Sequence, residues 1–354
     1  MTPEHWWAEP PHRWLAQLET TASDLAAIAR IPTRGDLVVS LSGGADSTAT
    51  YLHLLESGFL DAWEQAGGRV IRAFMDTGWE LPATYAYLRT LEERLGKVHR
   101  LVTWVPGPGE APPTGYDHLE PVWATPGKVM DADRWALARV FESRLGHYSP
   151  LIRLMLQWGK VPTSVRRWCT ADLKQRPVVG FLATLADPLN VIGVRAEESQ
   201  PRARAPAWEW SDSHDAWVWR PIKWWTKADR IEIHRRHGLA PNPLYLEGAG
   251  AGRVGCAICV NSGKDDLLWL SEHHSFHLEI LADLEEVLVG LDSAINAKGG
   301  KPYWMHLSTE GKDMPVPIRT AVEWASTTRG GRQVPLFRAP VDPGCSAWGL
   351  CEVR

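Results

Sequence analysis

The strongest constraint on the fold lies in residues 37–48, Leu-Val-Val-Ser-Leu-Ser-Gly-Gly-Ala-Asp-Ser-Thr. An apolar, β-branched run leads directly into a glycine-rich turn at residues 42–47, and residues 48–55 continue as a helix-compatible stretch. A strand, a glycine turn and a helix N-terminus together form an anion site, because backbone N–H groups and the helix dipole favour negative charge. The spacing matches neither the Walker sequence nor the dinucleotide fingerprint G-x-G-x-x-G. The alternative is an ordinary Gly-Gly turn between a strand and a helix.

Strand-like and helix-like segments alternate after this turn. Residues 69–75, 98–105 and 189–194 have the pattern of strands, and residues 82–95 have that of a helix. Such alternation predicts an α/β fold in which a doubly wound parallel sheet carries helices on both faces. Ligands of such a sheet bind at the carboxyl ends of its strands.

The expected domains follow from where this alternation begins and stops. The length of 354 residues permits two or three domains. We expect an N-terminal helical segment over residues 1–36, a nucleotide-binding domain over 37–245 and a cysteine-containing helical region over 246–354. A helical insertion is expected at about 106–165. In the last region, residues 265–291 are expected to form one helix, with His273, His274 and His277 on its surface.

Composition limits which partners and which cellular location we expect for this protein. The net charge of −4 carries no overall nucleic-acid signature, so any contact with nucleic acid must come from a local patch. Nothing at the N-terminus resembles a signal peptide and no apolar run reaches membrane-spanning length, so we expect a cytoplasmic protein with no membrane partner. The 20 tryptophans suit either the core or stacking on bases or an adenine ring.

Two strand ends carry residues that suit a bound nucleotide. Asp76 and Thr77 close the second strand, where they can hydrogen-bond ribose or adenine, or form an Asp-initiated turn with Gly78. Arg195 follows the strand near 189–194, after Gly193, which lets the backbone approach a ligand closely. Arg195 can therefore contact a phosphate, or else form a surface salt bridge with the glutamate at 197 or 198.

A basic cluster surrounds one of the five cysteines. Residues 159–177 contain Cys169 together with five cationic side chains, which are Lys160, Arg166, Arg167, Lys174 and Arg176. Such a cluster suits phosphate or sulfate, and its charge is expected to lower the pKa of the Cys169 thiol. The alternative is a solvated basic helix face with an incidental cysteine.

The remaining cysteines form two pairs. Cys256 and Cys259 make a C-x-x-C knuckle, and Cys345 and Cys351 lie near the C-terminus. Thiolates select zinc or iron–sulfur clusters, and the alternative to both is a set of unrelated buried cysteines. The four paired cysteines can hold a structural zinc ion, or Cys169, Cys256 and Cys259 can converge with a C-terminal cysteine on a cluster.

Six blocks, in order over about residues 37–262, resemble the PAPS-reductase-like branch of the adenine nucleotide alpha hydrolase superfamily. They are Ser-Gly-Gly-x-Asp-Ser at 42–47, Asp-Thr-Gly at 76–78, Cys-Thr-x-x-x-Lys-x-x-Pro at 169–177, Ile-Gly-x-Arg at 192–195, the stretch 220–245, and Gly-Cys-x-x-Cys at 255–259. The resemblance implies a loop that grips an ATP pyrophosphate or a comparable adenylyl group. The nucleotide-binding residues that it implies are Ser40, Ser42, Gly43, Gly44, Asp46, Ser47, Asp76, Thr77, Gly193 and Arg195.

Departures from this family bear on the cysteines. Thr170 stands where cluster-bearing reductases have a second adjacent cysteine, so the fourth ligand of a [4Fe–4S] cluster must be Cys345 or Cys351, unless one iron stays open. The terminal Cys-Gly-Leu-His segment of sulfonucleotide reductases is absent. These departures favour an ATP pyrophosphatase that adenylylates a target for sulfur incorporation, as relatives do in DNA phosphorothioation and tRNA thiolation.

The favoured function assigns roles and partners. ATP with Mg²⁺ is the expected ligand, a nucleic acid the possible substrate, and a cysteine desulfurase the possible sulfur donor. The catalytic residues expected from the resemblance are Asp46, Lys174, Arg195 and Cys169; the metal ligands are Cys169, Cys256, Cys259, Cys345 and Cys351. The alternatives are a sulfonucleotide reductase, and a subunit that senses nucleotides or binds nucleic acid without turnover.

Overall fold

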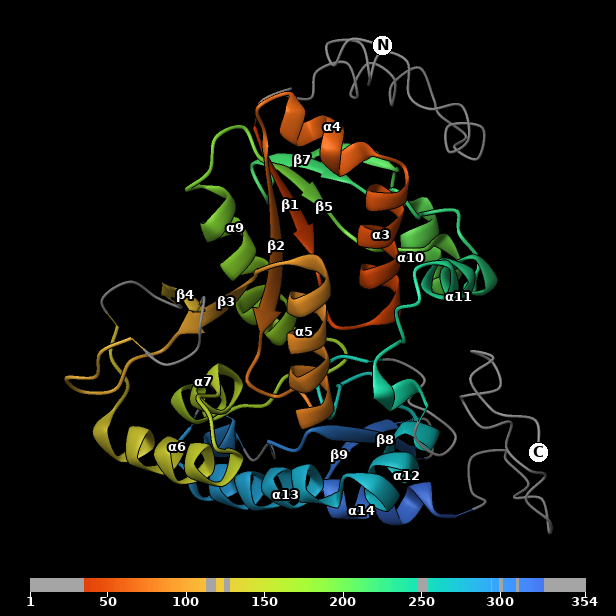
Figure 1. Cartoon of the computed structure of the whole chain (residues 1–354). Coiled ribbons are helices and arrows are strands. Elements are labelled where there is room, and N and C mark those ends of the chain that lie inside the picture. The colour runs from red at the N-terminus through yellow and green to blue at the C-terminus, as the bar shows by residue number, and fades with distance from the viewer. Residues whose placement is uncertain are drawn as a thin grey trace.

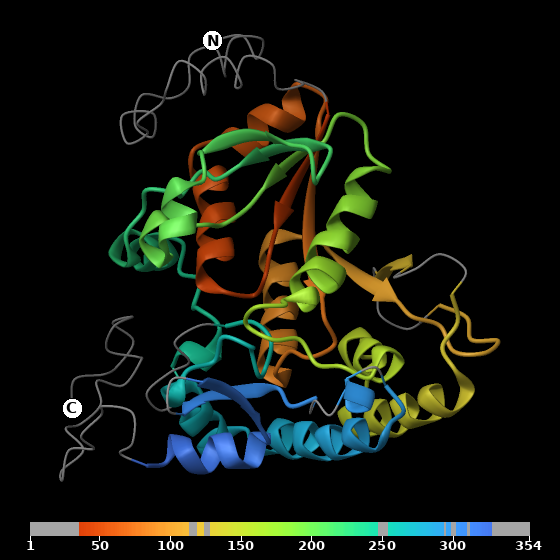
Figure 2. The ribbon, with the colours of Figure 1, turned by 180° about the vertical axis from the view of Figure 1, so that it is seen from behind.

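The computed structural model describes residues 35–112, 119–123, 128–246, 254–293, 295–298, 302–309 and 312–327 (Figure 1). The expected helical segment over residues 1–36 lies almost wholly outside the described residues, as do Cys345 and Cys351. In the described part, a sheet with flanking helices sits on a second, mainly helical layer that faces the carboxyl ends of the strands (Figures 1 and 2).

Seven strands form one sheet within the described residues. In hydrogen-bonded order they are β4 (Leu119–Trp123), β3 (Val98–Trp104), β2 (Arg69–Asp76), β1 (Asp36–Ser40), β5 (Leu189–Val191), β7 (Ala216–Trp219) and β6 (Trp208–Ser211). All neighbours are parallel except β6 and β7, which pair antiparallel. The prediction of a doubly wound parallel sheet is therefore confirmed, with an antiparallel edge strand in addition.

Helices cover both faces of this sheet (Figures 1 and 2). One face packs against α3 (Ala45–Glu56), α4 (Phe59–Gln65), α5 (Pro82–Leu95) and α11 (Lys227–Arg236), and the other against α9 (Arg176–Leu182). Successive side chains of a strand point to opposite faces. Leu37 and Val39 therefore join the first core and Val38 the second. Because β1 is buried on both faces, its sequence is a continuous apolar run rather than an alternating one.

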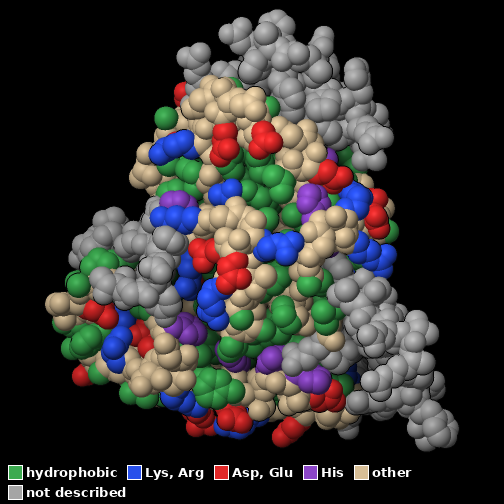
Figure 3. Space-filling view, in the orientation of Figure 1, with side chains coloured by type: hydrophobic (Ala, Val, Ile, Leu, Met, Phe, Trp, Pro, Cys, Tyr) green, Lys and Arg blue, Asp and Glu red, His purple; other side chains and the backbone are tan. Residues whose placement is uncertain are grey.

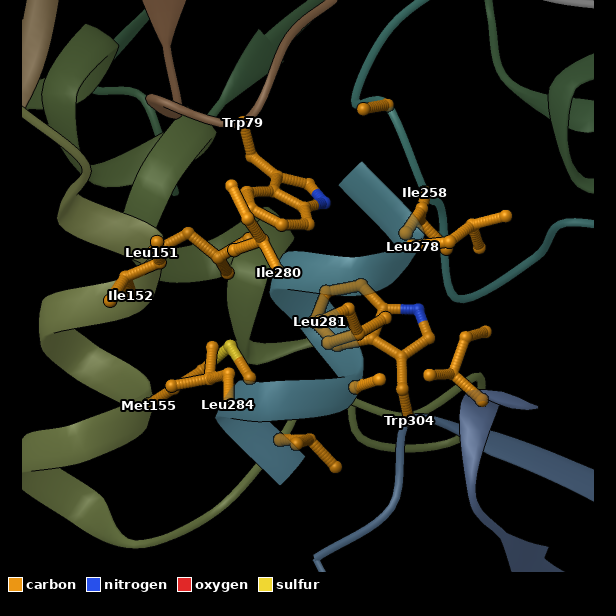
Figure 4. Close-up of a cluster of buried hydrophobic side chains, with 14 of the residues drawn as sticks. Trp79, Leu151, Ile152, Met155, Ile258, Leu278, Ile280, Leu281, Leu284 and Trp304 are labelled. Atoms are coloured by element: carbon orange, nitrogen blue, oxygen red, sulfur yellow. The ribbon is translucent and has the colours of Figure 1, made fainter. Parts of the chain in front are cut away.

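The second layer joins the insertion to the C-terminal region. It contains α6 (Ala132–Leu145), α7 (Pro150–Trp158), α12 (Lys264–His273), α13 (Ser275–Gly290), α14 (Ile318–Ala325) and the antiparallel pair β8 (Met305–Thr309) and β9 (Lys312–Val316). Figure 4 shows Met155 of α7 facing Leu284 of α13, with Leu281 beside Trp304, and Ile152 belongs to the same cluster. The two regions therefore share one hydrophobic core.

Short helical turns connect these elements. They are α8 (Trp168–Thr170), a π-helical turn η2 (Ala171–Gln175), α10 (Gln200–Arg204) and the 3₁₀ turns η3 (Ala196–Glu198), η4 (Pro243–Tyr245) and η5 (Asn296–Lys298). The first two lead into α9, and η3 with α10 follows β5.

The expected single helix over residues 265–291 and the expected surface position of His277 are both wrong. The helix breaks at His274, whose φ of −139° and ψ of 43° are not helical, so α13 begins a new face. On that face His277 continues a stripe with Leu281, Leu284 and Leu288, and it is 4% exposed. Its ring contacts Trp79 edge-on, at 5.5 Å between centroids. Burial lowers the pKa of His277 to about 4.

Candidate nucleotide-binding site

The glycine-rich turn lies where the order of strands reverses. β1 and β5 are neighbours, and the chain runs outward from β1 through β2, β3 and β4 on one side and from β5 toward β7 on the other. Open α/β sheets form a ligand-binding crevice at such a switch point, beyond the carboxyl ends of the strands. Gly193, just after β5, approaches α3 so closely that a Cβ would lie 2.8 Å from Ser47 Cα.

Hydrogen bonds within the turn fix its shape. Ser47 Oγ accepts a hydrogen bond from the Ser42 N–H at 2.9 Å and lies 2.9 Å from the Gly44 carbonyl oxygen, to which it donates. Gly43 has a φ of 71°, a left-handed conformation that favours glycine. Gly44 is the N-cap residue of α3 and provides no capping side chain, so an anion can take that place.

Two arginines converge on the carboxylate of Asp46. Arg195 Nε donates to Asp46 Oδ1 at 2.5 Å, and Arg195 Nη1 also contacts Glu197. Arg230 Nη1 lies 3.4 Å from both Asp46 oxygens. The predicted salt bridge of Arg195 with Glu197 thus exists together with a contact at the loop, and Arg195 is 5% exposed rather than on the surface.

A cavity of about 680 Å³ joins the loop to the cysteine knuckle. Its loop end is lined by Ser42, Gly44, Asp46, Ser47, Gly193, Arg195, Arg230 and Tyr245. Its other end is lined by Glu80, Arg167, Lys174, Cys256, Cys259 and Trp269. Six of the expected nucleotide-binding residues are therefore brought together, and the anion-binding loop and two thiols open into the same space.

Three cysteines lie around the ammonium of Lys174. The negative charge of Cys256 raises the pKa of Lys174, and those of Glu80, Cys259 and Cys169 act in the same direction. Desolvation raises the pKa of Cys256 to about 11, against the opposing charge of Lys174. Desolvation also raises the pKa of the buried Glu80 carboxyl. At the cysteine end of the cavity, one cation is thus surrounded by several groups that can carry a negative charge.

The expectation that a basic cluster lowers the pKa of Cys169 is wrong. Desolvation raises that pKa, and Lys174 only partly offsets it. The cationic side chains are spread over different surroundings: Arg176 pairs with Asp172 at 2.6 Å, and Lys160 lies over the Trp158 ring at 4.6 Å. Contiguity in sequence therefore did not produce one basic pocket around the thiol.

Asp76 and Thr77 lie behind the cavity wall. Asp76 accepts hydrogen bonds from the Gly78 N–H and the Tyr85 hydroxyl, both at 2.9 Å, and pairs with Arg100. Thr77 Oγ1 donates to Glu80 Oε1 at 2.7 Å. Gly78 has a φ of 63°, as the alternative of an Asp-initiated turn requires. Among the described lining residues, neither Asp76 nor Thr77 appears, and nor do Ser40 and Gly43.

The described cysteines can be compared with what a single zinc ion and an iron–sulfur cluster each require. Among the residues that the structure describes, no three His, Cys, Asp or Glu side chains converge closely enough to hold a single metal ion. Cys169, Cys256 and Cys259 are nevertheless free thiols around one cation. Cysteine thiolates are the ligands that iron–sulfur clusters take, so these three residues have the donor chemistry that a cluster requires.

Sequence reasoning missed the residues that hold the loop from behind. Asn242 Nδ2 donates to the Gly43 carbonyl at 3.1 Å, and the Tyr245 hydroxyl accepts from the Ala45 N–H at 3.3 Å. Both belong to the block at 220–245, whose order after the loop was a signal that they share its surroundings. Arg230 lies in the same block, but nothing singled it out there, because it is one cation among several on a charged helix.

A mostly parallel sheet with an anion-binding loop at its switch point defines a nucleotide-binding α/β protein. The profile of the phosphoadenosine phosphosulfate reductase domain matches residues 36–262, and the chain therefore belongs to that family. Relatives in the family are enzymes of the adenine nucleotide alpha hydrolase superfamily, as the six blocks predicted.

Individual relatives are similar to this chain to different extents. An uncharacterised 37.8 kDa protein of Escherichia phage 186 is 29% identical over 337 residues, which cover 89% of this chain and 96% of that protein. The adenosine 5′-phosphosulfate reductase of Allochromatium vinosum is 31% identical over 97 residues, 27% of this chain and 36% of that enzyme. The structure of phosphoadenylyl-sulfate reductase from Candida auris is 15% identical, with a TM-score of 0.37, and covers 72% of this chain and 93% of that one.

One further expectation concerns membranes. In the part of the chain that the structure describes, no helix is both long enough and apolar enough to span a bilayer.

Proposed function

We propose that the protein is an ATP pyrophosphatase that transfers AMP from ATP to an acceptor, which is then ready for sulfur incorporation. The acceptor oxygen attacks the α-phosphorus, the α–β phosphoanhydride bond breaks, and pyrophosphate leaves. A sulfur nucleophile then displaces AMP. The observation that carries the proposal is the Asp46 carboxylate at the N-terminus of α3, inside an anion-binding loop.

A carboxylate at this position suits the Mg²⁺ complex of ATP. A carboxylate oxygen can bind Mg²⁺, and Mg²⁺ is the cation that nucleoside triphosphates bring. The preference for ATP over a sulfonucleotide rests on the absence of the terminal Cys-Gly-Leu-His segment of sulfonucleotide reductases. Arg195, at 2.5 Å from Asp46, is placed to offset the charge of the pyrophosphate leaving group.

The cysteine end of the same cavity supports the sulfur step. Cys169, Cys256 and Cys259 would hold a [4Fe–4S] cluster, with Cys345, Cys351 or an external ligand on the fourth iron. When bound, the cluster would supply an iron site for sulfide. Lys174 lies among these thiols, so its role is to balance their charge rather than that of the phosphates. Zinc is the alternative metal.

The acceptor that we propose is a nucleic acid, with DNA phosphorothioation as one form of the reaction and a cysteine desulfurase as sulfur donor. On the face shown in Figure 3, basic and acidic side chains are interspersed over the described surface. Recognition would therefore be local, at the cavity, where Arg167 and Arg202 join the lining. This arrangement agrees with the net charge of −4.

The test is pyrophosphate release from ATP by anaerobically purified protein, with Mg²⁺ and with or without candidate nucleic acids. Wild-type protein is expected to release pyrophosphate and AMP in equal amounts and to contain iron. Asp46→Asn is expected to lose about 100-fold or more of this activity, since it removes a charge from the reacting centre. Asp61→Asn, at an exposed position on α4, is the matched control and should leave activity unchanged.

Three results would contradict the proposal. Asp46→Asn with wild-type turnover would remove the loop from the reaction. Binding of ATP with no turnover in the presence of each candidate acceptor would favour a nucleotide-sensing subunit. Sulfite release from a sulfonucleotide without ATP hydrolysis would favour a reductase, a second candidate that the local similarity to two adenosine 5′-phosphosulfate reductases supports.

A further inference from the structure

Arg230 occupies a position on α11 that is fixed from several directions. The helix begins with a capping box in which Asp229 Oδ2 accepts from the Thr226 N–H at 2.7 Å and Thr226 Oγ1 accepts from the Asp229 N–H at 3.3 Å. Arg230 follows this cap directly and is 7% exposed. Its guanidinium lies 5.9 Å from the centre of the Tyr245 ring.

One turn further along the same helix, His234 ties α11 to the start of α3. Its Nε2 lies 3.1 Å from the Ala45 carbonyl oxygen, and its Nδ1 lies 3.0 Å from that of Leu239. Residues four apart on a helix share a face. The face that carries Arg230 is therefore held against the first residues of α3, so the guanidinium is positioned before any ligand binds.

The contacts of Arg230 with Asp46 differ from those of Arg195. Arg195 Nε approaches one Asp46 oxygen to 2.5 Å, whereas Arg230 Nη1 is 3.4 Å from both. Charge-assisted N–H···O bonds are normally about 2.7–2.9 Å long. Arg195 is therefore the close partner of the carboxylate, and Arg230 is a second cation at the same end of the cavity, which it also lines.

We propose that Arg230 binds the pyrophosphate portion of the nucleotide and distinguishes polyphosphate ligands from monophosphates. This role of Arg230 adds to the proposed function, and the identity of the nucleotide rests on that proposed function. A planar guanidinium can bind two phosphate oxygens at once. Because Arg230 lies beside the loop and the N-terminus of α3, it faces the phosphates that this loop would hold rather than the thiols at the other end.

The experiment measures equilibrium binding of inorganic pyrophosphate, ATP and AMP, each with Mg²⁺, to the full-length protein. Arg230→Gln is expected to weaken pyrophosphate and ATP binding at least 10-fold and AMP binding less than 3-fold. Arg230→Lys keeps the charge without the planar fork and should lie between wild type and Arg230→Gln. Arg235→Gln removes a charge from an exposed position on the same helix and is the matched control.

A purely structural ion pair would behave differently. It would weaken AMP and pyrophosphate binding equally, or change only the melting temperature, and either result would overturn the proposal. So would wild-type protein that binds no pyrophosphate. If Arg230→Gln does not fold, Arg230→Lys decides, because wild-type pyrophosphate affinity in that variant refutes a role for the fork. Failure of the proposed function appears separately, as ATP that binds without pyrophosphate release.

Discussion

The close approach of Gly193 to α3 makes a single methyl group a sharp test of the site. In Gly193→Ala, the new Cβ would lie 2.8 Å from Ser47 Cα, 2.8 Å from Thr50 Oγ1 and 2.9 Å from the Asp46 carbonyl carbon. Two of these atoms belong to the backbone of the first turn of α3, which cannot rotate away. The cost is therefore overpacking, about 1–3 kcal/mol, rather than backbone strain.

Relief of this clash must move the end of β5 away from α3. Such a shift separates Arg195 from Asp46, because the two side chains are attached to the two elements that part. If the strain appears in binding, affinity for pyrophosphate falls by roughly 5- to 150-fold, at 1.4 kcal/mol for each factor of ten. The melting temperature is expected to fall by a few degrees.

Calorimetric titration with pyrophosphate and a thermal melt measure both effects. Gly290→Ala is the matched control, since a Cβ there meets open space at the end of α13. It should bind as wild type does and be equally or slightly more stable. Wild-type affinity and melting temperature in Gly193→Ala would refute the claim that this contact holds the site together.

Two further predictions concern buried ionisable side chains. His277 stays neutral in the folded protein because its pKa is about 4, whereas the unfolded chain takes up a proton near its usual 6.5, so stability is lost as pH falls from 6.5 to 4. His277→Phe should remove that loss. Measured by denaturant unfolding, the free energy of unfolding should fall by about 2–3 kcal/mol less in the variant than in wild type between pH 7 and pH 4.5. An unchanged pH dependence of stability would contradict this prediction. Arg153 is fully buried and hydrogen-bonds Glu110 at 2.8 Å and Glu142 at 2.7 Å. Arg153→Met should cost about 3–5 kcal/mol of unfolding free energy, against less than about 1 kcal/mol for the exposed Arg139→Met; equal losses would refute it.

The sequence predicted those parts of the molecule in which a local pattern determines the structure. Residues 82–95 were expected to be helical and form α5 with the same bounds, because Pro82 begins the helix and Gly96 follows its last residue. The glycine turn was recognisable because it needs a left-handed residue at Gly43 and an uncapped helix start at Gly44.

The rest depended on contacts between distant segments. The burial of His277 follows from packing against Trp79, almost two hundred residues earlier in the chain. Desolvation, which a run of charges in the sequence does not reveal, determines the direction of the Cys169 pKa. Arg230 belongs to the site only because α11 packs on α3, and no spacing between the two helices predicts that contact.

The shared core of the insertion and the C-terminal helices has a consequence for synthesis of the chain. Ile152 and Met155 of α7 are complete in sequence about 100 residues before Ile258 and well before the helix that carries Leu281. At ribosomal rates of 5–20 residues per second, their apolar surfaces wait roughly 5–20 s for partners. During translation the second layer can therefore form only late, whereas the pairing of β1, β2 and β3 can begin as these strands emerge.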